Sequence, residues 1–402
     1  MDRHPLQIQS PIAARTSDLI GHTPLMELLT TRFGTRVLLK LEQFNPTGTA
    51  KIRMARQMLD EAEAQGLLKP GGWVIESTSG NTGMGLALLA AERGYRFTAV
   101  VDHHASKDKL RAMQAFGAEL LYVNEEPGDG LVSRQASSVG CSLAVEAHCS
   151  VAPPRHSDGH DSSARLALHS DSGAINRHLR LDATLATADR EALAKRIAAE
   201  QGAYWTEQHN NPANANGYRA VADELEQALG ADITHLVGAV GTGGSLFGTA
   251  RELKQRLPSL RVIGVEPVGS IAFGGPGAPY YQSGTGTPEG AEIGELVDFR
   301  LLDEGLKVSD AQAFNTARYF ARTRGVLLGG SAGGVLYQAL KRAEVAPPMS
   351  TIVVLVCDGG EKYLDTVFND EWMNERGLID PAIDGELDAL MEQLTAGVAV
   401  RA

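Results

Sequence analysis

The stretch ITHLVGAVGTGGSLFGTARELKQR (residues 233–256) places a glycine-rich turn between an apolar run and a helix-forming run. Residues 233–240 are mostly apolar, which predicts a buried strand, and residues 245–256 predict a helix. The turn at 241–245 offers successive backbone N–H groups at a helix N-terminus, and such groups can hold a phosphate dianion. A tight strand-to-helix turn that binds no ligand is the alternative interpretation.

The order of strand, turn and helix repeats on both sides of this stretch. Expected strands cover residues 37–41, 73–75, 97–101, 119–123, 262–265 and 351–356, and expected helices cover residues 51–65, 82–93, 107–116, 189–201, 217–229, 310–324 and 333–344. Because parallel strands need long crossover connections, this alternation predicts an α/β fold with parallel sheets flanked by helices. An amphipathic helix is expected at the end of the chain, over residues 384–397.

Length and composition restrict the class of protein. A chain of 402 residues predicts two domains, or one large domain with additions. Lys and Arg number 37 and Asp and Glu number 49, so the formal net charge is −12, which argues against nucleic-acid and anionic-membrane binding. We find no apolar run of transmembrane length, no signal-peptide core and too few cysteines for a disulfide scaffold. We therefore expect a cytoplasmic globular protein without a nucleic-acid or membrane partner.

Residues 127–188 interrupt the alternation with scattered Ser, His, Gly and Asp and show no sustained period. We expect an insertion here that is partly disordered or folded over the surface. Five histidines together with Cys141 and Cys149 raise the alternative of a metal site, but their spacings match no compact zinc pattern. A solvated loop is the preferred interpretation, and no metal is predicted.

Two further loops carry reactive or polar groups at expected helix starts. The loop NPTGTAK ends on Lys51, where the positive end of the helix favours a neutral, nucleophilic amine. An exposed surface lysine is the alternative. Residues 76–83 crowd hydroxyl and amide side chains at the next helix start, which suits a carboxylate or a phosphate. Ordinary capping of the helix by Ser79, Asn81 or Thr82 is the alternative there.

A fourth loop, at residues 329–334, contains Ser331, which could face a buried ring nitrogen or simply cap the following helix. Together the four loops indicate one ligand with a phosphate, an aromatic ring and a lysine-reactive aldehyde, and pyridoxal phosphate has all three. A nucleotide-binding dehydrogenase would need a glycine fingerprint that we do not find. A binding protein without catalysis is a third class, and the intact Lys51 and Asn81 argue against it.

The order and content of these motifs resemble the cysteine synthase and cystathionine β-synthase family over residues 17–125 and 200–373. The resemblance implies the two-domain, tryptophan synthase β-like fold of the fold type II pyridoxal-phosphate enzymes. The implied division is a smaller α/β domain at 45–125 with the substrate-carboxylate loop, an insertion at 126–190, a larger cofactor-phosphate domain from 1–44 and 191–375, and a helical tail at 376–402.

The resemblance also implies a role for each matching residue. Lys51 matches the catalytic lysine that holds the cofactor as a Schiff base and removes the α-proton of the substrate. The remaining cofactor contacts match Asn81 at the ring hydroxyl, Ser331 at the pyridine nitrogen, and Gly241, Thr242, Gly243, Gly244 and Ser245 at the phosphate. The substrate contacts match Thr78, Ser79, Thr82 and Gln208 at the α-carboxylate, with His209 beside them.

The implied reaction is β-replacement on an O-activated L-serine, either O-acetylserine or O-phosphoserine. It proceeds through an aminoacrylate, with sulfide as the default nucleophile and cysteine as the product. The implied cofactor is pyridoxal phosphate, and the implied partners are small amino-acid substrates and a second copy of the chain in a homodimer. The protein is thus expected to be a pyridoxal-phosphate-dependent transferase or lyase of amino-acid biosynthesis.

Two positions depart from the family pattern. The usual Lys-Asp-Arg reads Lys51-Ile52-Arg53, which alters a local ion pair but spares the lysine. The usual phenylalanine beside Gln208 is His209, so the choice of donor or acceptor substrate can differ. A partly exposed loop histidine is the alternative interpretation of His209.

Two other activities within the family stay open. Residues 203–205 and 269–274 resemble the branch that makes N-(2-amino-2-carboxyethyl)-L-glutamate from O-phosphoserine and glutamate, although that branch tends to carry a serine where this chain has Gly241. Cystathionine β-synthase is the second alternative. We find no regulatory tandem domain after residue 375, and the N-terminus is short for a haem-binding extension, so this alternative is less favoured.

Overall fold

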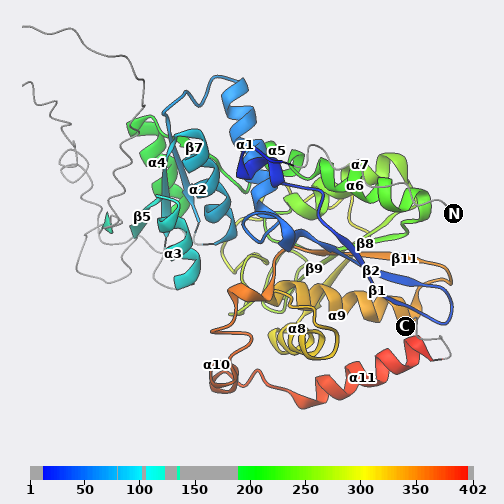
Figure 1. The fold of residues 1–402 in the computed structure, drawn as a ribbon. Coiled ribbons are helices and arrows are strands. Elements are labelled where there is room, and N and C mark those ends of the chain that lie inside the picture. The colour runs from blue at the N-terminus through cyan, green and yellow to red at the C-terminus, as the bar shows by residue number, and fades with distance from the viewer. Residues whose placement is uncertain (1–11, 79, 102–105, 123–133, 136–188, 397–402) are drawn as a thin grey trace, which may run out of the picture.

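The computed structural model describes residues 12–78, 80–101, 106–122, 134–135 and 189–396, and Figure 1 shows its strands and helices. Two sheets are present in these ranges. The six-stranded sheet has the order β1 (Leu25–Thr30), β2 (Arg36–Leu41), β11 (Thr351–Val356), β8 (His235–Ala239), β9 (Arg261–Pro267) and β10 (Glu304–Val308). The five-stranded sheet has the order β6 (Arg134–Gln135), β5 (Glu119–Tyr122), β4 (Arg96–Val101), β3 (Trp73–Ser77) and β7 (Tyr204–Trp205).

Strands run parallel in both sheets except at one edge of each. The pairs from β2 through β11, β8 and β9 to β10 are parallel, and so are the pairs from β7 through β3 and β4 to β5. β1 pairs antiparallel with β2, and β6 pairs antiparallel with β5. The predicted α/β class is confirmed. The antiparallel β1 edge corrects a purely parallel expectation, because a short hairpin connection cannot make a parallel crossover.

Helices flank both sheets. Their bounds are α1 (Lys51–Ala64), α2 (Asn81–Arg93), α3 (Lys107–Ala115), α4 (Asp189–Gln201), α5 (Pro212–Asn216), α6 (Arg219–Leu229), α7 (Gly244–Arg256), α8 (Asp310–Arg324), α9 (Gly330–Val345), α10 (Asp370–Glu375) and α11 (Pro381–Thr395). Most lie within a few residues of the sequence-based expectation. The sequence analysis does not predict β1, β6, β7, β10, α5 or α10. β10, with the sequence EGLKV, holds too few apolar residues for a strand pattern.

Three clusters of buried hydrophobic residues pack the helices against the two sheets. One lies on the face of the six-stranded sheet that α8, α9 and α11 cover, and it includes Phe314 and Phe320 (Figure 1). A second joins the other face of that sheet to the five-stranded sheet through α1, α2, α6 and α7, and it includes Met54 and Phe247. A third packs α4 on the outer face of the five-stranded sheet. α1, α2, α6 and α7 therefore lie between the two sheets, whereas α9 lies on the far side of the six-stranded sheet.

The end of the predicted insertion bears on the expected domain division. The insertion at 126–190 lies outside the described residues, apart from β6 and the first residues of α4. α4 and β7 pack on the five-stranded sheet, whereas the sequence-based division placed residues 191–205 with the larger domain. The division into domains stays a proposal, and on this packing its border lies after β7.

Glycines allow several of these helices to approach one another closely. A Cβ at Gly248 of α7 would lie 2.2 Å from the carbonyl oxygen of Ala215 in α5. A Cβ at Gly333 of α9 would lie 2.2 Å from the carbonyl oxygen of Ala313 in α8. The glycines at 330–334 therefore belong to a packed helix, and α9 begins three residues earlier than predicted. Within the described ranges, no helix is long and apolar enough to cross a membrane.

The close contact at Gly248 gives a first prediction. Gly248→Ala should lower the free energy of unfolding by about 1–3 kcal/mol, because the new methyl group must push α7 away from α5. Gly385→Ala is the matched control, since Gly385 lies inside α11 with no atom within 4 Å of its Cβ position. The control should stabilise the protein by up to about 1 kcal/mol through helix propensity. Denaturant unfolding measures both, and stabilisation by both variants would contradict the packing described here.

Candidate active site

Lys51 is the first residue of α1, and the chain around it is tied to the loop that follows β11. The N–H of Ala50 donates to the carbonyl of Cys357 at 2.8 Å, and Thr49 forms an isolated β-bridge with Asp358. The amine of Lys51 donates to the hydroxyl of Thr242 at 3.3 Å. The lysine loop and the glycine-rich turn, almost two hundred residues apart in sequence, therefore meet.

Burial lowers the pKa of Lys51, while Cys357 and Asp358 act in the opposite direction. A lower pKa raises the fraction of neutral amine, which is the nucleophilic and basic form. The sequence-based alternative of an ordinary exposed lysine does not agree with this environment.

The glycine-rich turn forms a cradle of backbone at the start of α7. Gly243 has φ +88° and precedes a helix whose first turn has no side-chain cap. A Cβ atom at Gly241 would lie 2.8 Å from the carbonyl oxygen of Gly284. A Cβ atom at Gly243 would lie 2.7 Å from the carbonyl oxygen of Leu296. Glycine is therefore required for the packing, and the uncapped N–H groups are available to an anion.

Asn214 connects this turn to the Gln208 segment, and sequence reasoning gave it no role. Its amide donates to the Thr242 hydroxyl at 3.1 Å and to the carbonyl of Gln208 at 2.7 Å. Its Oδ1 lies 2.0 Å from the Cβ position of Gly244, so a side chain there would collide with it. The sequence offers one weak signal, an asparagine between two alanines, and only the structure shows that this side chain is fully buried.

The predicted substrate-carboxylate residues lie together as far as the structure describes them. Thr82 donates to Oε1 of Gln208 at 2.7 Å, and Nε2 of Gln208 donates to the carbonyl of Ser77 at 3.0 Å. The hydroxyl of Thr78 accepts from the N–H of Gly83 at 3.2 Å. Ser79 lies outside the described residues. Hydroxyl, amide and backbone donors from two distant segments thus gather at the start of α2.

Glu76 organises the same place and was missed as a functional residue. Its carboxylate accepts from the N–H of Ser77 at 2.9 Å, from the N–H of Gln208 at 3.3 Å, and from the hydroxyl of Thr206. It is fully buried, and burial raises its pKa to about 7 against the hydrogen bonds, which lower it. A buried carboxylate that accepts three bonds holds the two substrate-side segments in register.

Asn81 and the start of α9, which carries Ser331, both contact the Asp358 loop. Nδ2 of Asn81 donates to Asp358 at 2.7 Å, and the Oδ1 atoms of both residues are buried without a hydrogen-bond partner among the described residues. Ser331 is buried in the first turn of α9, just after Gly329, whose N–H donates to the carbonyl of Asp358 at 3.1 Å.

His209 and Ser245 border the same region. Nε2 of His209 lies 3.4 Å from a carboxylate oxygen of Glu191 in α4, and its side chain is 39% exposed. Burial lowers the pKa of His209, Glu191 raises it, and the charge of Lys51 lowers it. The hydroxyl of Ser245 lies 3.9 Å from the thiol of Cys357. His209 is thus a partly exposed histidine whose charge interacts with Lys51.

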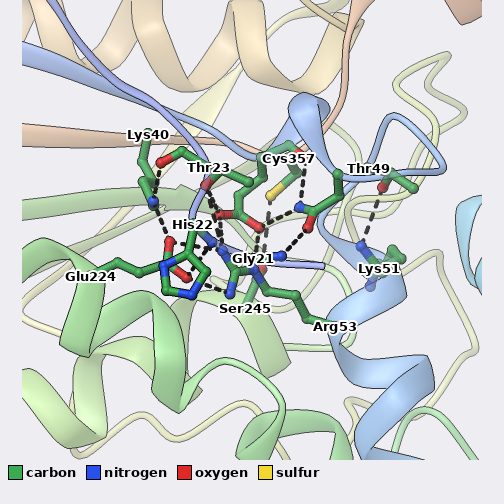
Figure 2. A network of polar contacts seen from close by, with 12 residues as sticks. Gly21, His22, Thr23, Lys40, Thr49, Lys51, Arg53, Glu224, Ser245 and Cys357 are labelled. Atoms are coloured by element: carbon green, nitrogen blue, oxygen red, sulfur yellow. Dashed lines mark hydrogen bonds and ion pairs between the residues drawn. The ribbon is translucent and has the colours of Figure 1, made fainter. Parts of the chain in front are cut away.

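A buried network of ion pairs holds the first turn of α1 through Arg53 (Figure 2). The guanidinium of Arg53 donates to Glu42 at 2.6 and 2.9 Å and to Glu224 at 2.8 and 2.9 Å. Lys40 donates to the carboxylate of Glu224 as well. Burial alone would raise the pKa of Glu224, but the bonds from Arg53 and Lys40 lower it to about 2. Ile52, the departure from the family pattern, is fully buried in the adjacent core.

These residues fit pyridoxal phosphate. The glycine cradle at the uncapped start of α7 suits its phosphate, the buried Lys51 amine suits its aldehyde, and the unpartnered Oδ1 of Asn81 suits a polar ring substituent. Among the described residues, no group of three His, Cys, Asp or Glu side chains could hold a metal ion.

Comparisons with known proteins show the family to which the chain belongs. The family model described as "Pyridoxal-phosphate dependent enzyme" matches residues 16–358, and the chain belongs to that family. It is thus a pyridoxal-phosphate-dependent enzyme of fold type II. A putative cysteine synthase of Sinorhizobium fredii is 44% identical over 373 residues, which cover 92% of this chain and 95% of the relative.

Two further matches place the chain among the cysteine synthase-like enzymes. An N-(2-amino-2-carboxyethyl)-L-glutamate synthase of Ralstonia nicotianae is 30% identical over 365 residues, covering 90% of this chain and 91% of the relative. The crystal structure of a cysteine synthase from Entamoeba histolytica is 27% identical with a TM-score of 0.70, covering 94% of this chain and 99% of that one. The family that the motifs indicated is therefore confirmed.

Glu76 gives a prediction with a definite sign. Its pKa is raised from 4.5 to about 7 in the folded protein, so folding favours the protonated carboxyl. Stability should therefore fall as the pH rises from about 4.5 to about 7, by about 3 kcal/mol in total from this group. Glu76→Gln should remove that dependence on pH. The stability of the variant relative to the parent enzyme should therefore rise between pH 5 and pH 8.

Urea unfolding of the cofactor-saturated enzymes at several pH values measures this difference. The exposed Glu200→Gln, in α4, is the matched control and should track the parent enzyme at every pH. A Glu76→Gln variant with the same pH slope as the parent would show that the Glu76 carboxyl titrates normally.

Proposed function

We propose that this enzyme catalyses β-replacement on an O-activated L-serine, O-acetylserine or O-phosphoserine, with sulfide as the nucleophile and cysteine as the product. The observation that carries the proposal is the 3.3 Å contact between the Lys51 amine and Thr242. This contact brings a lysine of lowered pKa to the glycine cradle, while Asn214 links the cradle to the Gln208 segment.

Each predicted residue receives a role within this proposal. Residues 241–245 would hold the cofactor phosphate, Asn81 would contact the ring hydroxyl, and Ser331 would face the ring nitrogen. Lys51 would bind the aldehyde covalently. When bound, pyridoxal phosphate supplies an electron-withdrawing ring that acidifies the α-carbon of an attached amino acid. Asp358 accepts from Asn81 and so orients that amide.

The chain's own groups account for the remaining steps. Thr78, Thr82 and Gln208 gather donors for the α-carboxylate of the substrate, and Glu76 holds Gln208 in place. The lowered pKa of Lys51 favours the neutral amine, and in that form Lys51 would take the α-proton of the substrate. These groups serve the first half of the reaction, the loss of the β-substituent, whatever nucleophile follows.

The choice of sulfide rests on two observations. The relative with 44% identity bears the name putative cysteine synthase, whereas the glutamate-using relative is 30% identical. Gly241 supports the same choice, since a Cβ at this position would lie 2.8 Å from the carbonyl oxygen of Gly284. The structure therefore has no room here for the serine typical of the glutamate-using branch. His209, in place of the phenylalanine usual beside Gln208, keeps that branch as the second candidate.

The role of Lys51 gives the next prediction. Lys51→Ala should abolish turnover and the visible absorbance of the lysine-bound cofactor, because no other described amine contacts Thr242. Absorption spectroscopy and an activity assay measure the two losses. Lys195→Ala, an exposed lysine of α4, is the matched control and should keep both. Retained turnover in Lys51→Ala would overturn the assignment of the site.

The substrate is tested by titrating the holoenzyme separately with O-acetylserine and O-phosphoserine while its visible spectrum is followed. A spectral change with one of them, reversed by sulfide with release of cysteine, is the expected result. Reversal by glutamate and not by sulfide would select the glutamate-using branch, and reversal by homocysteine would select cystathionine formation. No spectral change with either serine ester would refute β-replacement.

A further inference from the structure

Lys109 of α3 is a buried lysine for which the proposed reaction has no use. Only 3% of the residue is exposed. Two other cations of similar burial, Lys40 and Arg53, each have a carboxylate within hydrogen-bond distance. Within the described part of the chain, Lys109 forms no such ion pair, and its ammonium contacts two hydroxyl groups instead. Burial of a charged group without an opposite charge is costly, so this arrangement needs an explanation.

The contacts of the Lys109 ammonium are long. Its Nζ lies 3.4 Å from the hydroxyl of Ser283, 3.4 Å from the hydroxyl of Tyr363 and 4.7 Å from the centre of the Tyr363 ring. Charge-assisted hydrogen bonds of ammonium groups are usually about 2.7–2.9 Å long. The two hydroxyls therefore leave the ammonium with bonding capacity for a stronger acceptor.

The position of Lys109 connects it to the candidate active site. The Tyr363 hydroxyl donates to Oδ2 of Asp358 at 2.7 Å, and Asn81 donates to the same oxygen at 2.7 Å. Ser283 directly precedes Gly284, whose carbonyl lies against the phosphate cradle. The ammonium is thus one hydroxyl away from the loop that orients Asn81, and it also contacts the segment that borders the cradle.

Access and charge agree with a ligand at this place. Ser283 is exposed, so one of the two hydroxyl-bearing residues that contact the ammonium lies at the surface, while Lys109 itself is covered. Burial lowers the pKa of Lys109, the Asp358 carboxylate raises it and Lys362 lowers it. Asp358 already accepts from Asn81 and Tyr363, so an incoming anion would find Lys109 as the uncommitted cation.

We propose that Lys109 and Ser283 form a binding site for an oxyanion carried by a substrate of the β-replacement reaction, with Tyr363 holding the ammonium in place. This inference rests on the proposed function and adds its substrate class. The oxyanion has two sources: the phosphate of O-phosphoserine as the leaving group, or the side-chain carboxylate of an amino-acid nucleophile such as glutamate. Both offer acceptors only, and the ammonium and the serine hydroxyl are the matching donors.

The first experiment measures binding and does not depend on turnover. Isothermal calorimetry of the holoenzyme with inorganic phosphate and with glutarate should show that Lys109→Met weakens at least one of them about tenfold or more. Lys109→Arg, which keeps the charge, should retain most of the affinity. Lys107→Met, an exposed lysine two residues earlier in α3, is the matched control and should bind as the parent enzyme does.

The second experiment distinguishes the two sources by comparing kcat/KM. With sulfide as the nucleophile, Lys109→Met lowers kcat/KM for both donors or for one. If the decrease for O-phosphoserine exceeds that for O-acetylserine by about tenfold or more, the site is assigned to the leaving phosphate. With O-acetylserine as the donor, a similarly greater loss for glutamate than for sulfide assigns it to the nucleophile. Ser283→Ala should lower kcat/KM for the same substrate more than for the other, by a smaller factor than Lys109→Met.

Two outcomes would overturn the proposal. In one, Lys109→Met binds both anions as tightly as the parent enzyme. In the other, the kcat/KM of Lys109→Met falls by the same factor for every combination of substrates, as expected for a residue with a structural role alone. If Lys109→Met does not fold, judged by its unfolding midpoint and cofactor absorbance, Lys109→Arg and Ser283→Ala decide between these results. Failure of the proposed function is recognised separately, because the parent enzyme would then turn over no serine ester while calorimetry still reports on the anion site.

Discussion

Arg53 has a fully buried side chain and carries a positive charge two residues after Lys51. Glu42 and Glu224 bind that charge from two other parts of the chain, and Lys40 balances the second carboxylate. Removing one member of such a network typically costs about 3–5 kcal/mol, because the remaining charge stays buried. The network fixes the start of α1 against η2 (Glu42–Phe44) and α6, and hence fixes the direction from which the Lys51 amine approaches the glycine cradle.

Around this anchor, the site is assembled by hydrogen bonds between loops that lie far apart in the sequence. Lys51, Thr242, Asn214 and Gln208 form one chain of contacts that crosses from the lysine loop through the cradle to the substrate side. The cradle itself is held by close backbone packing, which only glycine permits. A rigid site of this kind places reacting groups without reorganisation, which is how a protein lowers the barrier of a cofactor-assisted reaction.

Burial acts on three ionisable groups of the site with opposite signs. It lowers the pKa of Lys51 and Lys109 and raises the pKa of Glu76, since in each case the charged form is disfavoured. For Lys51 the result is a nucleophilic amine. For Glu76 the result is a carboxyl group that titrates near neutral pH while it holds two substrate-side segments. For Lys109 an anionic partner would favour the charged form that burial disfavours.

The sequence by itself determined the fold class, the family and the four loops that carry the chemistry, because strand–helix alternation and glycine turns are local patterns. It also indicated Lys51, Asn81 and residues 241–245 by their places at helix starts. It did not indicate Asn214, Glu76 or Lys109, nor the strand β10, whose short sequence has no apolar period. Only the tertiary structure decided those roles, because a polar side chain acquires its function from partners that distant segments bring to it and from the water that the fold removes.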